Sequence, residues 1–335
     1  MTYYRPIVRR GRARPAGALP LAGGPAWFAE AECLSRGAAP RLVPASDLPE
    51  GWRAALTAPR APLAGLAMDR ARIMGILNVT PDSFSDGGAH IDPDTATAAA
   101  RAMAEAGAEI IDVGGESTRP GATEVPEREE IARIAPVIGP VAALGAPVSI
   151  DTRKAGVARA ALAAGAAVVN DVSALTFDPD LAGVCAETGA PVILMHAQGA
   201  PETMQDDPRY DDVLLDVFDA LAGHLARAEA AGIPRARCVV DPGIGFGKTL
   251  DHNLALIRGI ALFHGLGVPV LLGASRKGFI GQVSGAPGGA ARAPGSVAVA
   301  LRAAAEGVQL LRVHDVAETA QALALWQATE EGEAA

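Results

Sequence analysis

Polar residues that could do chemistry follow the short apolar runs of this 335-residue chain, one group after each run that could be a strand. They are Asn78, Asp112, Asp151, Asn170 with Asp171, His196, Asp241, Ser275 with Arg276 and Lys277, and Arg312 with His314 and Asp315. Any one of them could cap the helix that follows it, as Asp and Asn often do. His, Arg and Lys are poor helix caps, so the series as a whole favours one shared site.

Three of these residues, Asp151, Asn170 and Asp241, offer carboxylate and amide acceptors together with one amide donor. That inventory suits a heterocycle that presents an amino group and ring N–H donors. A carboxylate inside a fold is costly unless it is satisfied, so we expect a matching ligand or ion. Lys277 could donate to a ring oxygen or nitrogen of the same ligand. Alternatively, Asp241 and Lys277 form a purely structural ion pair.

A second group of residues indicates an anion site. Arg312 and His314 are two positions apart on an extended segment, so both point to the same side. Asn78 ends the first strand, which neighbours the last strand in a closed barrel, and Arg119 lies in a "STRPG" loop that could close over the anion. Asn78 could also meet a magnesium ion that shares oxygens with a diphosphate.

The elements that must position these residues begin at residue 72, where short β-like runs alternate with alanine-rich helical runs. Eight such units in about 260 residues predict an α/β fold of the (β/α)8 TIM-barrel type, in which the strand ends converge on one face. A doubly wound open sheet is the alternative, but it usually has a Gly-rich turn after its first strand. We therefore predict a barrel over residues 71–330 and an irregular N-terminal extension, residues 1–70, packed on it.

Composition excludes several classes of protein. A formal net charge of −9 argues against a nucleic-acid partner, and the absence of an 18-residue apolar run argues against a membrane span. Three cysteines without a CxxC pair, and an N-terminus unlike a secretory signal, predict a reducing, cytoplasmic location. The stretch "DPGIGFGKT" fails the P-loop spacing because Pro242 stands where the first glycine is required. No histidine pair has zinc-site spacing.

Taken together, the motifs resemble those of the dihydropteroate synthase family over about residues 72 to 325. The matching stretches are "GILNVTPDSFSDGG", "IIDVGGESTRPGA", "SIDT", "VVNDVSA", "LMHAQGAPETMQ", "DPGIGFGK", "GASRKGFIG" and "RVHDVAET". The resemblance implies a pterin-binding barrel, usually a homodimer. It implies the condensation of 6-hydroxymethyl-7,8-dihydropterin diphosphate with 4-aminobenzoate, which gives 7,8-dihydropteroate and pyrophosphate in folate biosynthesis.

The resemblance also implies roles for individual residues. Pterin would be held by Asp151, Asn170, Met195, Asp241 and Lys277; diphosphate by Asn78, Thr118, Arg119, Arg312 and His314, with Mg²⁺ at Asn78; aminobenzoate by Phe84, Pro120, Phe246, Ser275 and Arg276; and Asp82, Asp86 and Ser117 would belong to lid loops. The reaction itself would depend on Asp151, Asp241, Lys277, Arg312 and His314. Many members carry Ser where this chain has Gly278, which removes a hydroxyl donor for aminobenzoate and for its sulfonamide mimics.

Two alternatives stay open at this point. A pterin-binding methyltransferase domain of the corrinoid-dependent kind uses a similar barrel, but it would not need "STRPG" together with "RVHD", which indicate diphosphate. A catalytically silent homologue should have lost one or more of Asp151, Lys277, Arg312 and His314, and all four are present.

Overall fold

The predicted eight-stranded parallel barrel is confirmed in the computed structural model, which describes residues 1–80, 92–117, 122–199 and 203–331. Its strands are β6 (Arg72–Asn78), β7 (Ile110–Gly114), β8 (Val148–Asp151), β9 (Val168–Asp171), β10 (Val192–Met195), β11 (Cys238–Asp241), β12 (Leu271–Leu272) and β13 (Leu310–Val313). They follow the order β11-β10-β9-β8-β7-β6-β13-β12. A parallel bridge between Val240 and Val270 joins the two ends of this order and closes the barrel.

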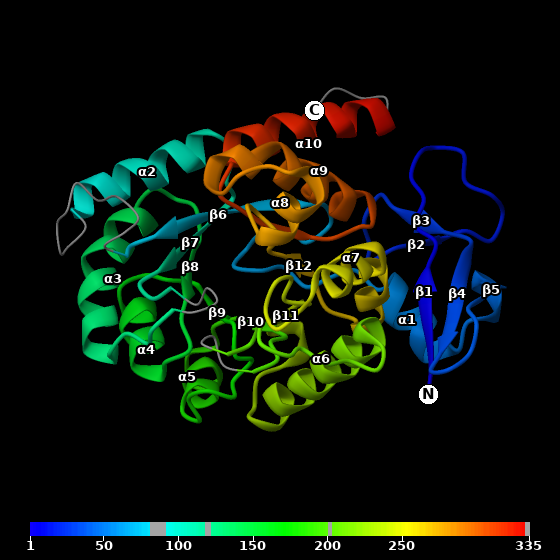
Figure 1. The fold of residues 1–335 in the computed structure, drawn as a ribbon, viewed down its shortest axis with the longest axis horizontal. Helices are drawn as coiled ribbons and strands as arrows, with labels where there is room; N and C mark the ends of the chain where they lie inside the picture. The colour runs from blue at the N-terminus through cyan, green and yellow to red at the C-terminus, as the bar shows by residue number, and fades with distance from the viewer. Residues whose placement is uncertain (81–91, 118–121, 200–202, 332–335) are drawn as a thin grey trace.

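Helices surround the strands (Figure 1). They are α2 (Pro93–Glu105), α3 (Glu127–Ala142), α4 (Ala155–Ala163), α5 (Leu181–Thr188), α6 (Val213–Ala230), α7 (Leu250–Arg258), α8 (Gly278–Ser284), α9 (Ala293–Ala305) and α10 (Val316–Glu331), with 3-10 turns η3 (Arg235–Arg237), η4 (Ile260–Leu266) and η5 (Gly289–Arg292). Local sequence sets their starts: the Asp92 side chain accepts from two backbone N–H groups at the start of α2, and Thr249 forms a capping box with His252 at α7. None of the described helices is long and apolar enough to cross a bilayer.

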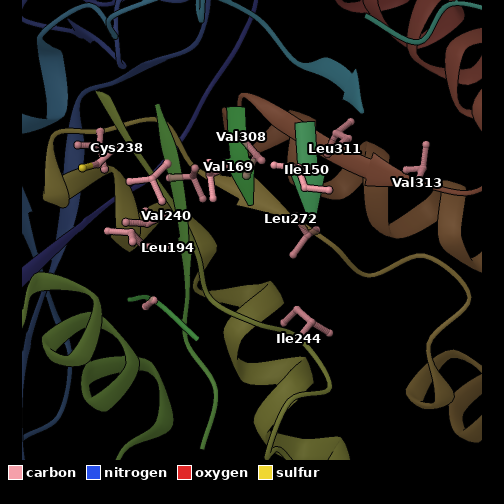
Figure 2. Close-up of a cluster of buried hydrophobic side chains, with 14 of the residues drawn as sticks. Ile150, Val169, Leu194, Cys238, Val240, Ile244, Leu272, Val308, Leu311 and Val313 are labelled. Carbon is pink, nitrogen blue, oxygen red and sulfur yellow. The ribbon is translucent and has the colours of Figure 1, made fainter. Parts of the chain in front are cut away.

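The alternation of side chains along each strand divides the core into two layers. Outward-facing residues such as Val169, Leu194, Val240 and Leu311 pack in the cluster of Figure 2, which belongs to the layer between strands and helices. Inward-facing residues fill the lower barrel as a second cluster, made by Met74, Ile110, Val168, Ile193, Val239, Leu271 and Leu310, together with Leu63 and Met68 from below. Because the side-chain period of a strand is two, each residue two positions further along also faces inward.

Residues 1–70 hold more regular structure than their Pro- and Gly-rich sequence predicted. Antiparallel strands β1 (Thr2–Pro6), β4 (Glu30–Ser35) and β5 (Arg41–Pro44) form a sheet beside the pair β2 (Leu19–Pro20) and β3 (Trp27–Phe28), η1 (Ala45–Asp47) and α1 (Glu50–Thr57). Phe28, Ala31 and Leu56 are fully buried in a small core of their own. The strands are short and several end at proline, which hides the alternation that identifies a strand.

This extension packs on the outside of the barrel at α6 and η4. The Trp52 ring stacks on the Phe218 ring of α6 with centroids 5.5 Å apart, and the Tyr3 hydroxyl donates to the Asp219 carboxylate at 2.8 Å. Gly265 in η4 lies directly under Trp52, where a Cβ atom would overlap the indole. The extension is therefore fitted to the barrel wall by shape as well as by hydrogen bonds.

Replacing Trp52 by alanine should lower the free energy of unfolding by about 3 kcal/mol, because it opens a cavity between α1 and α6. Urea denaturation measures the change. Leu42→Ala is the matched control on the same extension, since Leu42 is 61% exposed, and it should stay within about 0.5 kcal/mol of the wild type. Equal stability of the Trp52→Ala and Leu42→Ala variants would show that the extension does not support the barrel.

Candidate active site

Inward-facing polar residues form a ring at the mouth of the barrel where the strands end. Asp112, Asn170, Asp241 and Arg312 each lie two positions after a residue of the lower apolar cluster, and Asp151 pairs in register with Asn170. Met195 pairs in register with Asp241 and closes one side of the ring. The sequence-predicted residues Asn78, Asp151, Asn170, Met195, Asp241 and Arg312 thus lie at one end of the barrel.

Arg312 occupies the centre of this ring between two carboxylates. Its Nε donates to Asp112 Oδ2 at 2.6 Å, and its Nη2 donates to Asp151 Oδ2 at 2.7 Å. Asn170 Nδ2 is a second donor to Asp112 Oδ2, at 3.2 Å. In the described structure, the guanidinium predicted for an anion is therefore bound to carboxylates, and its role toward diphosphate stays a prediction.

Asp112 is a site residue that the sequence assignment of roles missed. Its side chain is completely buried and contacts both Arg312 and Asn170. The missed signal is the alternation of side chains along the strand. In "IIDVG", Asp112 lies between two outward-facing apolar residues, Ile111 and Val113, so it must point into the barrel.

Two carboxylate oxygens of this ring lack partners. Asp112 Oδ1 and Asp151 Oδ1 are buried, and no donor within the described residues reaches either of them. An unmet buried acceptor costs about 1–3 kcal/mol. Burial raises the pKa of Asp151 to about 7, against the attraction of Arg312 and with the help of the Asp112 charge. The ring is therefore prepared for a ligand that brings N–H donors.

Asp241 and Lys277 lie on the adjacent side of the mouth. Asp241 Oδ1 accepts from the Gly243 N–H at 2.7 Å, and burial raises the pKa of Asp241. The Lys277 ammonium donates to the Ile244 carbonyl and lies 4.5 Å from the centre of the Phe246 ring. Burial lowers the pKa of Lys277 to about 8, although the Asp241 charge opposes this. Among the described residues, no ion pair joins Asp241 to Lys277. The alternative that the two form a purely structural ion pair is therefore not supported.

The residues predicted for anion and aminobenzoate contact each other at the end of β13. Ser275 Oγ lies 3.0 Å from His314 Nδ1 and accepts from the His314 N–H at 3.1 Å. The Arg276 guanidinium is bound to the Asp315 carboxylate, with Nε 3.1 Å from Oδ2. Ser275 thus lies beside His314, which was predicted to bind the anion. The Arg276 guanidinium binds the Asp315 carboxylate, whereas the predicted partner was the carboxylate of aminobenzoate.

Asn78 lies at the end of β6, where its Oδ1 and the Cβ of Asp151 flank the backbone of Gly114. Six predicted residues lie outside the described residues: Asp82, Phe84 and Asp86 in one loop, and Thr118, Arg119 and Pro120 in another. Their roles stay predictions. Ser117, the last described residue before the second loop, is half-buried.

A cavity of ≈ 400 Å³ opens beside the ring. Its walls include Val172, Thr176, Phe177, Met195, Met204 and Phe246. Apolar walls next to a ring of hydrogen-bonding groups are typical of a site for a flat, polar-edged molecule.

Comparison with known proteins gives a consistent family. The model of the family described as "Pterin binding enzyme" matches residues 74–314. A dihydropteroate synthase of Escherichia coli strain K12 is 47% identical over 265 residues, which is 79% of this chain and 93% of that protein. A dihydropteroate synthase of Neisseria meningitidis serogroup C is 46% identical over 266 residues, 78% of this chain and 94% of that protein.

Solved structures agree with this family. Xanthomonas albilineans dihydropteroate synthase with 4-aminobenzoic acid has a TM-score of 0.76 and 49% identity, and the match covers 81% of this chain and 98% of that one. The same enzyme in complex with 7,8-dihydropteroate has a TM-score of 0.73 and 45% identity, with the same coverage. Yersinia pestis dihydropteroate synthase with a sulfonamide drug complex has a TM-score of 0.75 and 46% identity, over 79% and 96% of the two chains.

Replacing Arg312 by methionine should destabilise the fold by about 3 kcal/mol near pH 8, because it leaves the buried Asp112 and Asp151 carboxylates without their cation. The loss should shrink as the pH falls. The pKa of Asp151 is already raised to about 7, so acid neutralises the uncompensated charge in the variant. Urea unfolding at pH 8 and pH 5.5 measures both values. A deficit that grows toward acid pH would contradict this arrangement.

Proposed function

This chain belongs to the pterin binding enzyme family, among the dihydropteroate synthases. From this membership we propose how the mouth of its barrel performs the dihydropteroate synthase reaction. We propose that it condenses 6-hydroxymethyl-7,8-dihydropterin diphosphate with 4-aminobenzoate, giving 7,8-dihydropteroate and pyrophosphate in folate biosynthesis. The reaction forms a C–N bond from the aryl amine to the pterin methylene and breaks the C–O bond to diphosphate. The surplus proton of the amine leaves to solvent.

The observation that carries this proposal is the pair of unmet buried acceptors, Asp112 Oδ1 and Asp151 Oδ1. A dihydropterin ring has an amino group and ring N–H groups along one edge, and those donors match the unmet oxygens. Asp241 adds a further carboxylate, and the Lys277 ammonium can donate to a ring oxygen or nitrogen on the far edge. Met195 offers an apolar, polarisable surface for the ring face.

The diphosphate would lie toward β6 and β13. Arg312, His314 and Asn78 lie there. Because Asp112 and Asp151 hold the Arg312 guanidinium in place, it does not have to reorganise when the diphosphate leaves. The carboxylates of Asp151 and Asp241 favour the positive charge that develops on the pterin methylene as the C–O bond lengthens. The aryl amine is neutral and nucleophilic, so the site needs orientation more than a strong base.

We also propose a magnesium ion at Asn78. The described residues contain no cluster of three or more His, Cys, Asp or Glu that could hold a metal by themselves. One amide oxygen fits Mg²⁺, which is commonly bound by one or two protein oxygens together with water and substrate phosphates. When bound, the ion would neutralise charge on the diphosphate.

We infer further that the chain works as a cytoplasmic homodimer and is inhibited by sulfonamides. The free cysteines Cys33, Cys185 and Cys238 are buried thiols, in agreement with a reducing compartment. Val283 on α8 and Leu325 on α10 are exposed apolar side chains that a second copy could cover. Gly278 at the start of α8 leaves backbone N–H groups, without a side-chain hydroxyl, for the carboxylate of aminobenzoate or its mimic.

Purified protein mixed with pterin diphosphate and labelled 4-aminobenzoate should form labelled dihydropteroate and one pyrophosphate per product, and EDTA should stop both. A methyltransferase domain or a silent homologue would bind pterin without releasing pyrophosphate. Product formation unaffected by EDTA would reject the magnesium proposal while leaving the synthase proposal intact. Pterin binding without any pyrophosphate would reject the synthase proposal.

Asp241→Asn should weaken pterin diphosphate binding by about 1–3 kcal/mol, because the amide presents a donor where the ring needs an acceptor. Titration calorimetry measures the affinity. Asp180→Asn, at an exposed carboxylate before α5, is the matched control and should bind as tightly as the wild type. Wild-type affinity in the Asp241→Asn variant would remove Asp241 from the pterin site.

A further inference from the structure

Lys248 is a buried lysine that has no role in the proposed reaction and, unlike Lys154, no carboxylate partner among the described residues. The sequence contains only three lysines, Lys154, Lys248 and Lys277. Lys277 faces the pterin site, and Lys154 is buried in ion pairs with Glu116 and Glu130. Lys248 is 3% exposed. No carboxylate within the described ranges comes into ion-pair distance of it, so its burial needs another explanation.

The ammonium of Lys248 is surrounded by acceptors from two loops. It lies 3.0 Å from Phe246 O, 3.3 Å from His196 O and 3.0 Å from His196 Nδ1. Burial lowers the pKa of His196 to about 2, so the imidazole is neutral and its Nδ1 can accept. Tyr210 faces the same ammonium from the side, with its ring centre 6.0 Å away. Lys248 thus joins the loop after β10 to the loop after β11.

The loop after β11 has no regular secondary structure of its own and is held by side chains. Four consecutive carbonyls, those of residues 244 to 247, each accept from a different residue: Lys277 donates to Ile244 O, Gln205 to Gly245 O, Lys248 to Phe246 O and Tyr210 to Gly247 O. Glycines let this loop approach its neighbour closely. A Cβ atom on Gly243 would overlap His196 O, and one on Gly247 would overlap Gln198 O.

This loop carries Phe246, whose ring lies against the Lys277 ammonium and lines the cavity beside the pterin site. The carbonyl that Lys248 holds is that of Phe246 itself. Loss of this hydrogen bond would therefore act directly on the backbone that carries the Phe246 ring. At the other end of the loop, Asp241 Oδ1 accepts from the Gly243 N–H, so the pterin carboxylate has an anchor besides Lys248.

We propose that Lys248 is a positioning residue for the aminobenzoate end of the site, which acts by holding Phe246 against Lys277. The inference rests on the proposed synthase function. It adds the residue that positions Phe246, one wall of the aminobenzoate pocket. Lys248 itself touches neither substrate.

Steady-state kinetics of Lys248→Met test this role. The KM for 4-aminobenzoate should rise on the order of tenfold, the scale expected when buried carbonyls lose their donor. The turnover number and the KM for pterin diphosphate should change by less than about threefold. In a Phe246→Leu background the same substitution should add little, because the two residues act through one ring. Equal changes in both KM values, or full additivity in the double variant, would overturn the proposal.

A second measurement needs no activity. Labelling with [ε-13C]lysine gives three signals, which single Lys→Arg variants assign. The Phe246 ring face shields Lys277, so Lys248→Met and Phe246→Leu should both shift the Lys277 signal downfield, while Lys154 stays in place as the internal control. If the methionine variant does not fold, Lys248→Gln, which keeps an amide donor, should give a smaller shift of the same sign. An unmoved Lys277 signal in the folded variant overturns the inference.

The two experiments separate the inference from the function on which it rests. If the wild-type protein forms no dihydropteroate, the proposed function fails, and the Lys277 signal alone then decides whether Lys248 positions Phe246. If the wild type is active and Lys248→Met leaves the aminobenzoate KM unchanged, the function stands and the inference fails.

Discussion

The placement of Arg312 between Asp112 and Asp151 is the interaction on which the rest of the site depends. Two carboxylates in the mouth of a barrel are tolerated because one guanidinium satisfies one oxygen of each. Its fixed geometry leaves the other two oxygens buried and unmet. The same pairing therefore leaves two acceptors that fit a ligand with N–H donors, and we propose that stability and recognition depend on this one cluster.

The fold brings this cluster together because alternate residues of each strand face into the barrel. Inward positions of the lower barrel are apolar except for Ser149 on β8, and the next inward position along most strands is polar, so the core ends where the site begins. Beyond the strand ends, positioning passes to side chains that bind loop carbonyls, as Lys277 and Lys248 do after β11. The extension of residues 1–70 contacts α6 and η4 through Trp52 and Tyr3 and has its own small core.

Sequence reasoning predicted the barrel and the convergence of its strand ends, because repeated βα units and terminal polar residues are local signals. It gave Asp112 no role in the site, because the only signal is the alternation of inward and outward side chains along "IIDVG". It predicted substrate anions as partners of Arg312 and Arg276, which stays a prediction, but it did not predict their bonds to the Asp112 and Asp315 side chains. Such pairings join residues up to 200 positions apart, and only the folded chain shows them.

A crystal structure of the protein with pterin diphosphate bound tests the central claim most directly. The account predicts that the amino and ring N–H groups of the pterin lie within hydrogen-bond distance of Asp112 Oδ1 and Asp151 Oδ1, with the diphosphate toward Asn78 and His314. A pterin ring bound elsewhere, with those two oxygens still unmet, would contradict it.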